Sequence, residues 1–382
     1  MPRQILVSAG EASSDRYAAM LVEELRRLWP DAHFFGCAGP RMRQAGVDPV
    51  IQSESLAVVG LVEVLLHLPR IYRQYRELLD AASRVRPQLA ILTDSPDFHL
   101  RVARRLKREG VPVVYLVAPQ VWAWRRGRIP LIRRTVDRLL CIFPFEEPFF
   151  RERGIPAWYI GHPLAGQLRP VLEKAEFFRK HRLALNRQLV TVLPGSRKGE
   201  AARHLPVLLD AVERIYNHRV THFLLPASET TGGAFFRERI GRAPIQVIEG
   251  ETCDALAHAD LALAASGTVT IEAALAGVPM ITFYKVNPLS WLLGRLLVRV
   301  PFYSMVNLVA GRAVVPELMQ TEMTGERLAA EALRMLTDTD ACRRMRQDLA
   351  EIARRLSGAG RAMENASRLV EELMEGHAAH VS

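Results

Sequence analysis

The sequence predicts an α/β protein built from two doubly wound parallel-sheet domains, and two observations support this prediction. Short apolar runs of β-type composition alternate with amphipathic helical stretches along most of the chain. This alternation is typical of βαβ units, in which helices cover both faces of a parallel sheet. At 382 residues with 49% hydrophobic content, the chain is also too long for one ordinary hydrophobic core, so two domains are expected.

The first half of the chain contains six apolar runs that we expect to form strands, with helices between them. One helix places Tyr17, Leu21 and Leu25 on a single face, and another follows the loop after residue 93 and ends near Gly110. The expected strands are Ile5–Ala9, His33–Gly36, Leu89–Thr93, Val113–Val117, Leu139–Phe143 and Trp158–Ile160.

Residues 163–187 are charged and show no strand pattern, after which the alternation starts again. We therefore expect an N-terminal Rossmann-like domain at residues 1–165 and a second one at 166–345. A helical tail, residues 346–382, follows, and we expect it to pack back on the N-terminal domain. The strands expected in the second domain are Leu189–Leu193, Thr221–Leu225, Ile245–Ile248, Leu261–Ala264 and Pro279–Phe283.

The composition limits the class of protein and its compartment. The N-terminal apolar run is too short for a signal peptide, and no uninterrupted apolar run is long enough to span a bilayer. The four cysteines have no paired spacing, which argues against disulfides or zinc and indicates a reducing cytoplasm. A net charge of +10 favours phosphates, anionic lipid or nucleic acid without choosing between them.

The loop at residues 115–128 joins an apolar strand to two tryptophans and three arginines: Trp122, Trp124, Arg125, Arg126 and Arg128. Tryptophan beside arginine suits large or anionic ligands, through apolar area, cation–π contact and fork-shaped hydrogen bonding. The alternative is a core tryptophan followed by solvated arginines. In doubly wound sheets ligands bind at the carboxyl ends of the strands, so the loops that follow the strands are the candidate sites.

Two such loops in the first domain carry carboxylates. Asp94, Asp97 and His99 follow the strand that ends at Thr93, and they could supply a general base. Glu11 follows the first strand in a run of small residues. The alternatives are structural, because Asp97 could cap the next helix, Asp94 could form a turn and a serine could cap the helix after Glu11.

Two loops in the second domain have the character of phosphate sites. Residues 193–200 join a strand to a helix through a glycine turn that carries Ser196, Arg197 and Glu200, which favours a phosphate cradle over a plain surface turn. The loop starting at residue 265 offers backbone N–H groups and hydroxyls at a helix start, where a diphosphate is favoured. Its candidate residues are Ser266, Gly267, Thr268 and Glu272, the last placed to reach ribose hydroxyls.

Two apolar stretches are edged by arginine, residues 56–68 and residues 291–300. Buried core is one interpretation. The other is contact with an anionic bilayer or with acyl chains. For the first stretch the candidate lipid contacts are Val59, Val62, Leu65 and Leu66.

Taken together, these motifs resemble those of the lipid-A-disaccharide synthase family, glycosyltransferases of the two-domain GT-B fold. The resemblance covers nearly the whole chain in order. The matching motifs are Ala9–Ser13, Leu56–Val58, Asp94 with Pro96–Phe98, Val121–Trp124, Gly161–Leu164, Leu193–Arg197 with Glu200, Ser266–Thr268 with Glu272, and Asn307 with Val315–Leu318 and Gln320. The chain departs from the family pattern at Ser14, where a glycine is usual.

The resemblance implies two facing domains with a central cleft and an inverting reaction without a metal or cofactor. UDP-2,3-diacylglucosamine would transfer its sugar to 2,3-diacylglucosamine 1-phosphate, giving a β-1,6-linked disaccharide and UDP. It further implies a cytoplasmic enzyme on the inner membrane surface, and a homodimer.

The resemblance also implies roles for single residues. Asp97 is the expected base, with Glu11 and His99 as the next candidates, and the residues of the two phosphate-type loops would bind UDP. As a further hypothesis of our own, Arg125 and Arg126 hold the acceptor's phosphate. The remaining acceptor and lipid contacts are expected at Asp94, Trp122, Trp124, Asn307 and Gln320.

Two rival functions remain from the sequence alone. A nucleotide-sugar epimerase of similar architecture would need no acceptor site and no membrane-facing apolar patch. A nucleic-acid-binding protein would gather its arginines on one face together with aromatic residues, whereas the charges here are spread over many helices.

Overall fold

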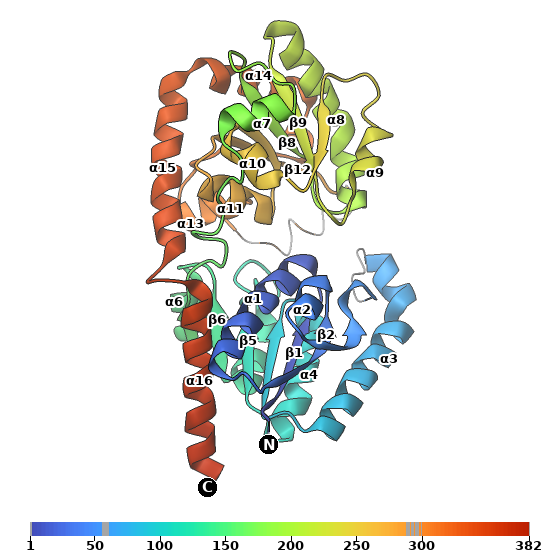
Figure 1. Ribbon diagram of the computed structural model, residues 1–382, viewed down its shortest axis with the longest axis vertical. Helices are drawn as coiled ribbons and strands as arrows, with labels where there is room; N and C mark the ends of the chain where they lie inside the picture. Colours follow the sequence, from blue (N-terminus) through green and yellow to red (C-terminus); the bar gives the residue numbers. More distant parts are fainter. Residues whose placement is uncertain are drawn as a thin grey trace. The chain divides into compact units, whose positions relative to one another are not determined.

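A computed structural model of the protein describes residues 2–55, 61–287, 291, 294, 298 and 300–381, without side-chain detail at residues 55, 61–67 and 378–381. The chain forms two compact units (Figure 1). The first comprises residues 1–163 with 356–382, and the second comprises residues 164–355. The domain limits expected at residues 165 and 345 stay predictions, and residue 345 itself lies within the helix α15 (Thr339–Ser357).

The first unit is built on a seven-stranded parallel sheet in the order β3-β2-β1-β4-β5-β6-β7. The strand order reverses between β1 and β4, which lie side by side with Ala9 opposite Thr93 at their carboxyl ends. This is the switch point of a doubly wound sheet, where ligands bind. The strands are β1 (Gln4–Ala9), β2 (His33–Ala38), β3 (Asp48–Gln52), β4 (Leu89–Thr93), β5 (Val113–Leu116), β6 (Arg138–Cys141) and β7 (Ala157–Tyr159).

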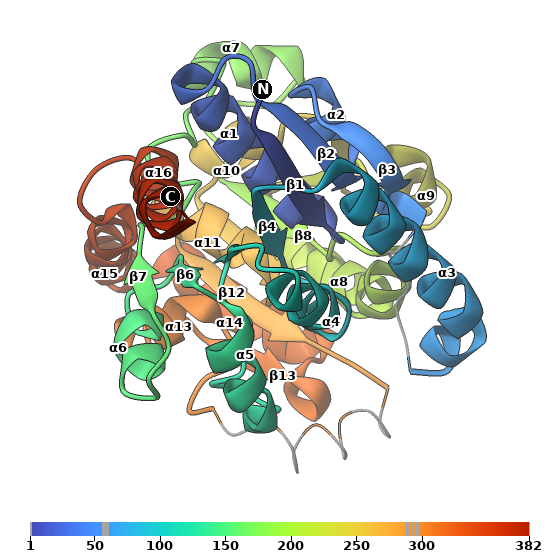
Figure 2. The ribbon, with the colours of Figure 1, turned by 90° about the horizontal axis from the view of Figure 1, so that it is seen from below.

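Helices cover both faces of this sheet (Figure 2). α1 and α16 pack together on one face, and α3, α4 and α5 lie on the other. All five residues of β4 are buried, as expected for a strand covered on both sides. The helices of the unit are α1 (Ala12–Leu28), α2 (Pro40–Gln44), α3 (Leu61–Val85), α4 (Pro96–Arg108), α5 (Ile129–Thr135), α6 (Glu146–Arg151) and α16 (Ala362–Val381).

The C-terminal helix α16 belongs to the first unit although it lies more than 200 residues after β6 in the chain. It runs alongside α1 and β6 (Figure 1). The Asn365 amide donates to the Ile160 carbonyl at 3.1 Å, and Arg138 pairs with Glu372 at 2.9 Å. Side chains therefore tie the end of the chain to the edge of the first sheet.

The second unit contains a six-stranded parallel sheet in the order β10-β9-β8-β11-β12-β13. Its order reverses between β8 and β11, where Leu193 lies opposite Ala264. The strands are β8 (Leu189–Leu193), β9 (His222–Ala227), β10 (Gln246–Glu249), β11 (Leu261–Ala265), β12 (Met280–Tyr284) and β13 (Glu317–Met319). The helices are α7 (Lys174–Lys180), α8 (Lys198–His218), α9 (Gly233–Arg237), α10 (Thr252–Ala257), α11 (Thr268–Leu275), α13 (Met305–Ala310), α14 (Gly325–Thr337) and α15 (Thr339–Ser357).

Two parallel sheets with helices on their faces confirm the predicted α/β class. The sequence did not predict the edge strands β3 and β13. β3 reads Asp-Pro-Val-Ile-Gln, with only two adjacent apolar residues and a proline of the kind that edge strands tolerate. β13 has three residues and is too short to show a period.

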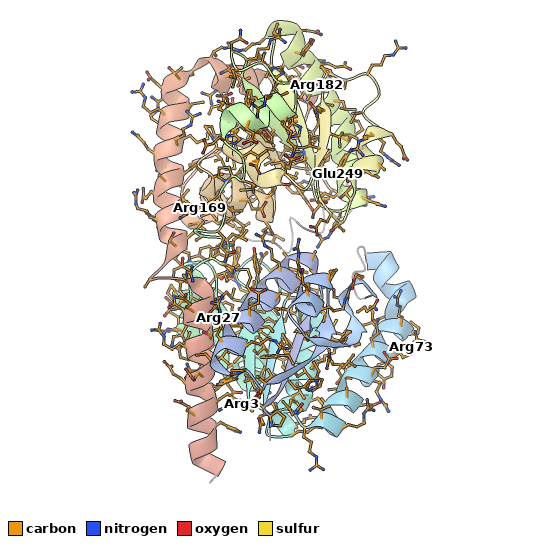
Figure 3. All side chains as sticks on the ribbon, viewed as in Figure 1. Arg3, Arg27, Arg73, Arg169, Arg182 and Glu249 are labelled. Carbon is orange, nitrogen blue, oxygen red and sulfur yellow. The ribbon has the colours of Figure 1, made fainter. Side chains whose placement is uncertain are left out.

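The arginines are distributed over separate elements of the surface (Figure 3). In the first unit Arg3 precedes β1, Arg27 lies at the end of α1 and Arg73 lies on α3. This spread differs from the single basic face that nucleic-acid binding would require. Within the part of the chain that the structure describes, no helix is both long enough and apolar enough to cross a membrane.

Candidate active site

Asp94 joins the loops that follow β1 and β4 in the first unit. Its carboxylate accepts the backbone N–H of Gly10 at 3.1 Å and that of Glu11 at 2.9 Å. The Ser14 hydroxyl donates to the same carboxylate. A glycine at position 14, which the resemblance led us to expect, would have no side chain to supply this donor.

The carboxyl of Asp94 lies in a poorly solvated position. Burial, and then the nearby charge of Glu11, raise the pKa of Asp94 to about 7, although hydrogen bonds from the Ser95 side chain and from the backbone of Gly10 and Glu11 favour its charged form. The backbone is also strained, because Asp94 has a φ of 52° and Ser95 a φ of 38°. Strained, non-glycine residues of this kind cluster at functional sites. Asp94 therefore lies in a strained turn and braces the loop after β1, and its role in the acceptor site stays a prediction.

Glu11, a candidate base, begins helix α1. It is the N-cap, and its side chain and that of Ser14 form a reciprocal capping box. The serine cap considered from the sequence is therefore replaced by a glutamate cap. The Glu11 side chain remains exposed beside Asp94.

His99, the other alternative base, is fully buried. Its Nδ1 lies 2.9 Å from the Asp94 carbonyl, which can only accept, so Nδ1 carries the proton. Its Nε2 lies 2.7 Å from the Ser8 hydroxyl and then accepts from it. Burial lowers the pKa of His99 to about 4. Both ring nitrogens are engaged inside the unit, so this geometry favours Asp97 over His99 as a base.

Asp97, the first candidate base, lies in the first turn of α4 and is 72% exposed. The helix begins at Pro96 with Ser95 as its N-cap, so Asp97 is not the cap that the structural alternative required. Its carboxylate pairs with Arg125 at 2.7 Å and with Arg128. The loop after β5 therefore reaches the loop after β4 through these ion pairs.

The two tryptophans of this loop have different surroundings. The Trp122 ring is buried, with its edge toward Phe145 at 5.0 Å between ring centroids, and its Nε1 donates to Glu146 at 3.1 Å. Trp124 is 37% exposed, and the Arg125 guanidinium lies 4.3 Å above its ring. The core interpretation holds for Trp122, and the ligand-facing one agrees with the exposure of Trp124.

Two residues of this region, Arg128 and Glu146, were not among the predicted site residues. Arg128 is visible in the sequence, but its position in the loop gave no reason to prefer it over Arg126. In the structure Arg126 is exposed and has no ion pair among the described side chains. Glu146 follows an apolar strand in a Phe-Glu-Glu-Pro run that resembles an ordinary helix start. Burial raises the pKa of Glu146 to about 8.

In the second unit, the basic loop after β8 begins with Gly195, which has a φ of 124°. A Cβ at this position would lie 2.6 Å from the Glu200 carboxyl carbon, so only glycine allows this approach. Arg197 is the exposed N-cap of α8, and Ser196 is exposed beside it. The residues predicted to cradle phosphate therefore lie at the start of a 21-residue helix.

Glu200 is half-buried and faces Tyr284 at the end of β12. Burial, and then the charge and hydrogen bond of Glu200, raise the pKa of Tyr284 to about 12. The Tyr284 hydroxyl is therefore protonated at neutral pH. Glu200 then has a partner inside the unit in addition to any ligand.

The loop after β11 lies beside the basic loop, because β8 and β11 are neighbours. Gly267 is the N-cap of α11, Thr268 is its exposed first residue and Glu272 is half-buried one turn further along. The Ser266 hydroxyl donates to the Tyr303 carbonyl at 2.8 Å, and its N–H donates to Phe283 at 2.8 Å. The expectation that this serine offers a free hydroxyl and N–H is therefore wrong.

Asn307 and Gln320, expected at the acceptor, both belong to the second unit. The Asn307 amide is buried, accepts from the N–H groups of Val314 and Val315 and donates to Val315 and Glu317. The Gln320 amide bonds both backbone groups of Val286, at 2.6 and 3.2 Å. Asn307 thus braces the segment that leads into β13, and Gln320 braces the segment that follows β12.

The candidate lipid contacts cannot be placed by side chain. Val59 lies outside the described residues, and Val62, Leu65 and Leu66 lie in α3 where only the backbone is described. Further along α3, Arg70, Arg73 and Arg76 are exposed. The expected arginine edge is therefore accessible, and the apolar part stays a prediction.

The described candidate residues thus gather at two switch points. In the first unit Glu11, Asp94 and Arg125 lie on the loops after β1, β4 and β5, and Asp97 and His99 lie at the start of α4. In the second unit the residues predicted to bind UDP lie on the loops after β8 and β11 and in the first turns of α8 and α11. Trp122, Asn307 and Gln320 instead have hydrogen-bond partners within their own units.

Comparisons with known proteins identify the relationship of the chain. A family model described as lipid-A-disaccharide synthetase matches residues 5–372. The chain is 64% identical over 382 residues, the whole of both proteins, to the lipid-A-disaccharide synthase of Solibacter usitatus. It is 43% identical over 381 residues to the enzyme of Myxococcus xanthus, covering 98% of this chain and 99% of the relative.

Solved structures share the fold at much lower identity. A glycotransferase of kitacinnamycin aligns with a TM-score of 0.67 at 16% identity, covering 98% of this chain and all of its own. A putative UDP-N-acetylglucosamine 2-epimerase from Listeria monocytogenes aligns with a TM-score of 0.64 at 15% identity, covering 98% of each chain. At this identity the likeness concerns the fold alone, and it agrees with the predicted GT-B class. From the family model and the full-length relatives, the chain belongs to the lipid-A-disaccharide synthetase family.

Proposed function

We propose that this chain is a glycosyltransferase that forms the lipid A disaccharide. The observation that carries the proposal is the 64% identity with a lipid-A-disaccharide synthase over the full length of both chains. Its substrates are a UDP-sugar donor and a sugar acceptor. In full, UDP-2,3-diacylglucosamine and 2,3-diacylglucosamine 1-phosphate give the β-1,6-linked disaccharide 1-phosphate and UDP, with inversion.

The epimerase alternative is not favoured. The epimerase structure resembles the chain at 15% identity, which reports only the fold. The lipid-A-disaccharide synthases of two organisms match at 64% and 43% over nearly the whole chain. The sequence relationship therefore outweighs the likeness of architecture.

In this proposal the second unit binds UDP. Arg197, exposed at the start of α8, supplies a fork of donors for the diphosphate, and the start of α11 at Gly267 and Thr268 adds the positive end of a helix dipole. Ser196 and Glu200 are further proposed UDP contacts, and Glu272 accepts from the ribose hydroxyls. Ser266 holds its loop through the Tyr303 carbonyl. The fixed positive groups stabilise the charge that gathers on UDP as it leaves.

The first unit binds the acceptor and supplies the base. Asp97 is the proposed base, because it is exposed whereas His99 is buried with both nitrogens engaged, and the exposed Glu11 is the alternative carboxylate. It takes the proton from the acceptor's 6-hydroxyl while that oxygen bonds to the anomeric carbon of the donor. The bond from this carbon to the diphosphate oxygen breaks, and its electron pair leaves with UDP through an oxocarbenium-like transition state.

We further propose that the enzyme works at the cytoplasmic face of the inner membrane as a homodimer. The exposed Arg70, Arg73 and Arg76 of α3 suit anionic lipid headgroups next to the apolar residues 56–68. Flotation with vesicles that contain anionic phospholipid tests the first part, with neutral vesicles as the control. Light scattering of the purified chain tests the second.

Incubation with UDP-diacylglucosamine and diacylglucosamine 1-phosphate tests the reaction. We expect UDP to be released only when both are present, together with a disaccharide 1-phosphate. Isomerised sugar from the donor alone would instead favour an epimerase. Tight nucleic-acid binding with a steep salt dependence, and no UDP release, would support the nucleic-acid alternative.

A further inference from the structure

Asp97, Trp124, Arg125 and Arg128 form one cluster on the first unit, here called the Asp97 cluster. The Asp97 Oδ2 accepts from Arg125 at 2.7 Å, and its Oδ1 accepts from Arg128. Both guanidinium groups also lie over the Trp124 ring, at 4.3 Å for Arg125 and 5.7 Å for Arg128. The cluster therefore holds two positive groups against one negative group.

The fold fixes the two arginines more firmly than it fixes Asp97. The Arg128 side chain is only 15% exposed and the Arg125 side chain is 41% exposed. The indole ring beneath them adds cation–π attraction. Asp97 is 72% exposed, and surface ion pairs of this kind contribute little free energy. The carboxylate is therefore the part of the cluster that a ligand displaces most easily.

A phosphate monoester suits the place that Asp97 fills. Two guanidinium forks match the oxygens of a phosphate as they match those of a carboxylate, and a dianion gains more from two positive groups. We infer that Arg125 and Arg128 bind the phosphate of the acceptor, and that Asp97 occupies this anion site until the acceptor arrives. This inference rests on the proposed function, and it adds Arg128 to the acceptor site in place of Arg126.

The replacement of Asp97 by the acceptor's phosphate at the two arginines, here called the exchange, couples acceptor binding to catalysis. While Asp97 is paired, each of its oxygens accepts from a guanidinium and is less available to a hydroxyl. When the phosphate takes the two arginines, the carboxylate is released to accept the 6-hydroxyl proton as the new C–O bond forms. An acceptor without the phosphate would leave Asp97 paired, so the enzyme would select phosphorylated acceptors by their reactivity as well as by their affinity.

A binding experiment without turnover tests the exchange directly. Glucose 1-phosphate is titrated against the wild type, Asp97→Asn and Arg128→Gln, with tryptophan fluorescence as the signal. Removing the competing carboxylate should tighten binding of glucose 1-phosphate by about 2- to 10-fold, because the phosphate then no longer has to break two exposed ion pairs. Losing Arg128 should weaken binding by about 10- to 100-fold. Equal or weaker binding by Asp97→Asn would overturn the exchange.

A kinetic experiment tests the selection. The kcat/KM is compared for diacylglucosamine 1-phosphate and for diacylglucosamine in the wild type, Arg128→Gln and the exposed control Arg134→Gln. Arg128→Gln should reduce the preference for the phosphorylated acceptor by about 10- to 100-fold while the control keeps it. A preference lost in Arg126→Gln and kept in Arg128→Gln would refute the assignment.

A replacement variant and two distinct outcomes allow the inference to be tested separately from the folding of Arg128→Gln and from the proposed function. If Arg128→Gln does not fold, Arg125→Gln replaces it, because the Arg125 side chain is 41% exposed. A wild type that binds glucose 1-phosphate as predicted but transfers no sugar would refute the proposed function alone. A wild type that transfers sugar with equal preference for both acceptors would refute the inference alone.

Discussion

The indole Nε1 of Trp122 donates a hydrogen bond to Glu146 Oε1 at 3.1 Å inside the first unit. The other carboxylate oxygen of Glu146 accepts the Phe143 backbone N–H at 3.2 Å. Both side chains are buried, at 9% and 1% exposure. This contact anchors the loop that carries Trp124 and Arg125 to the start of α6.

Replacing Glu146 with alanine should therefore destabilise the first unit. The change leaves the Trp122 and Phe143 donors without partners and opens a cavity, at a cost of about 2–4 kcal/mol in the free energy of unfolding. Urea denaturation followed by tryptophan fluorescence measures this. The exposed control Glu152→Ala should change stability by less than about 0.5 kcal/mol. A loss no greater than that of the control would contradict the anchoring role.

The two poorly solvated carboxyls, Asp94 and Glu146, also predict how stability depends on pH. The pKa of Asp94 is raised to about 7 and that of Glu146 to about 8, so the folded state binds protons that the unfolded state has lost. Their contribution to stability is present at low pH and is lost as pH rises through these values. Burial lowers the pKa of His99 to about 4 and that of His162 to about 3, so these contribute fully above about pH 6.5.

Between about pH 6.5 and 8, the two carboxyls still change the free energy of unfolding with pH, whereas the contribution of the two histidines is constant. The free energy of unfolding should fall by about 1–2 kcal/mol over this window. Unfolding midpoints in urea at several pH values check the slope. Asp94→Asn and Glu146→Gln should each flatten it. A slope that persists unchanged in both variants would assign it to other groups.

The architecture was predictable because parallel strands buried on both faces are continuous apolar runs, as in β4 and β8. The edge strands β3 and β13 were not predictable, because a short strand at the edge of a sheet can form with few apolar residues. The loops after β1, β4, β8 and β11 were expected as sites, since topology brings them to the switch points.

The individual side-chain contacts within those loops could not be predicted from the sequence. Whether Arg126 or Arg128 meets Asp97 depends on the left-handed backbone at Arg125, which no spacing rule reveals. The burial of Glu146 behind Trp122 depends on packing between distant segments. For the same reason the saturated amide of Asn307 resembled a ligand contact in the sequence.

Asp97→Asn tests the proposed base. An asparagine amide cannot take up a proton, so kcat/KM for disaccharide formation should fall by about 10²- to 10⁴-fold. The side chain is 72% exposed, so the free energy of unfolding should stay within about 0.5 kcal/mol of the wild type. UDP binding serves as the control and should be unchanged, since its proposed contacts belong to the second unit. Near-normal turnover in the variant would exclude Asp97 as the base.

Gly195→Ala tests the proposed phosphate loop of the second unit. Gly195 has a φ of 124°, and an added Cβ would lie 2.6 Å from both the carboxyl carbon and the Oε2 of Glu200. The backbone strain should lower the free energy of unfolding by about 1–3 kcal/mol, and the Glu200 side chain would have to move aside. Because the turn sets the position of Arg197, the Kd for UDP should rise by about 10-fold or more.

Gly199→Ala is the matched control, four residues along the same loop and helix. An alanine Cβ there meets no atom within 4 Å, and Gly199 lies in the first turn of α8, where alanine is the better helix former. This variant should be neutral or more stable by up to about 1 kcal/mol, with unchanged UDP binding by calorimetry. If both variants bind UDP as the wild type does, the loop after β8 does not hold the diphosphate. If both lose binding equally, added volume at an exposed loop is responsible, and the close approach of Glu200 to Gly195 has no special role.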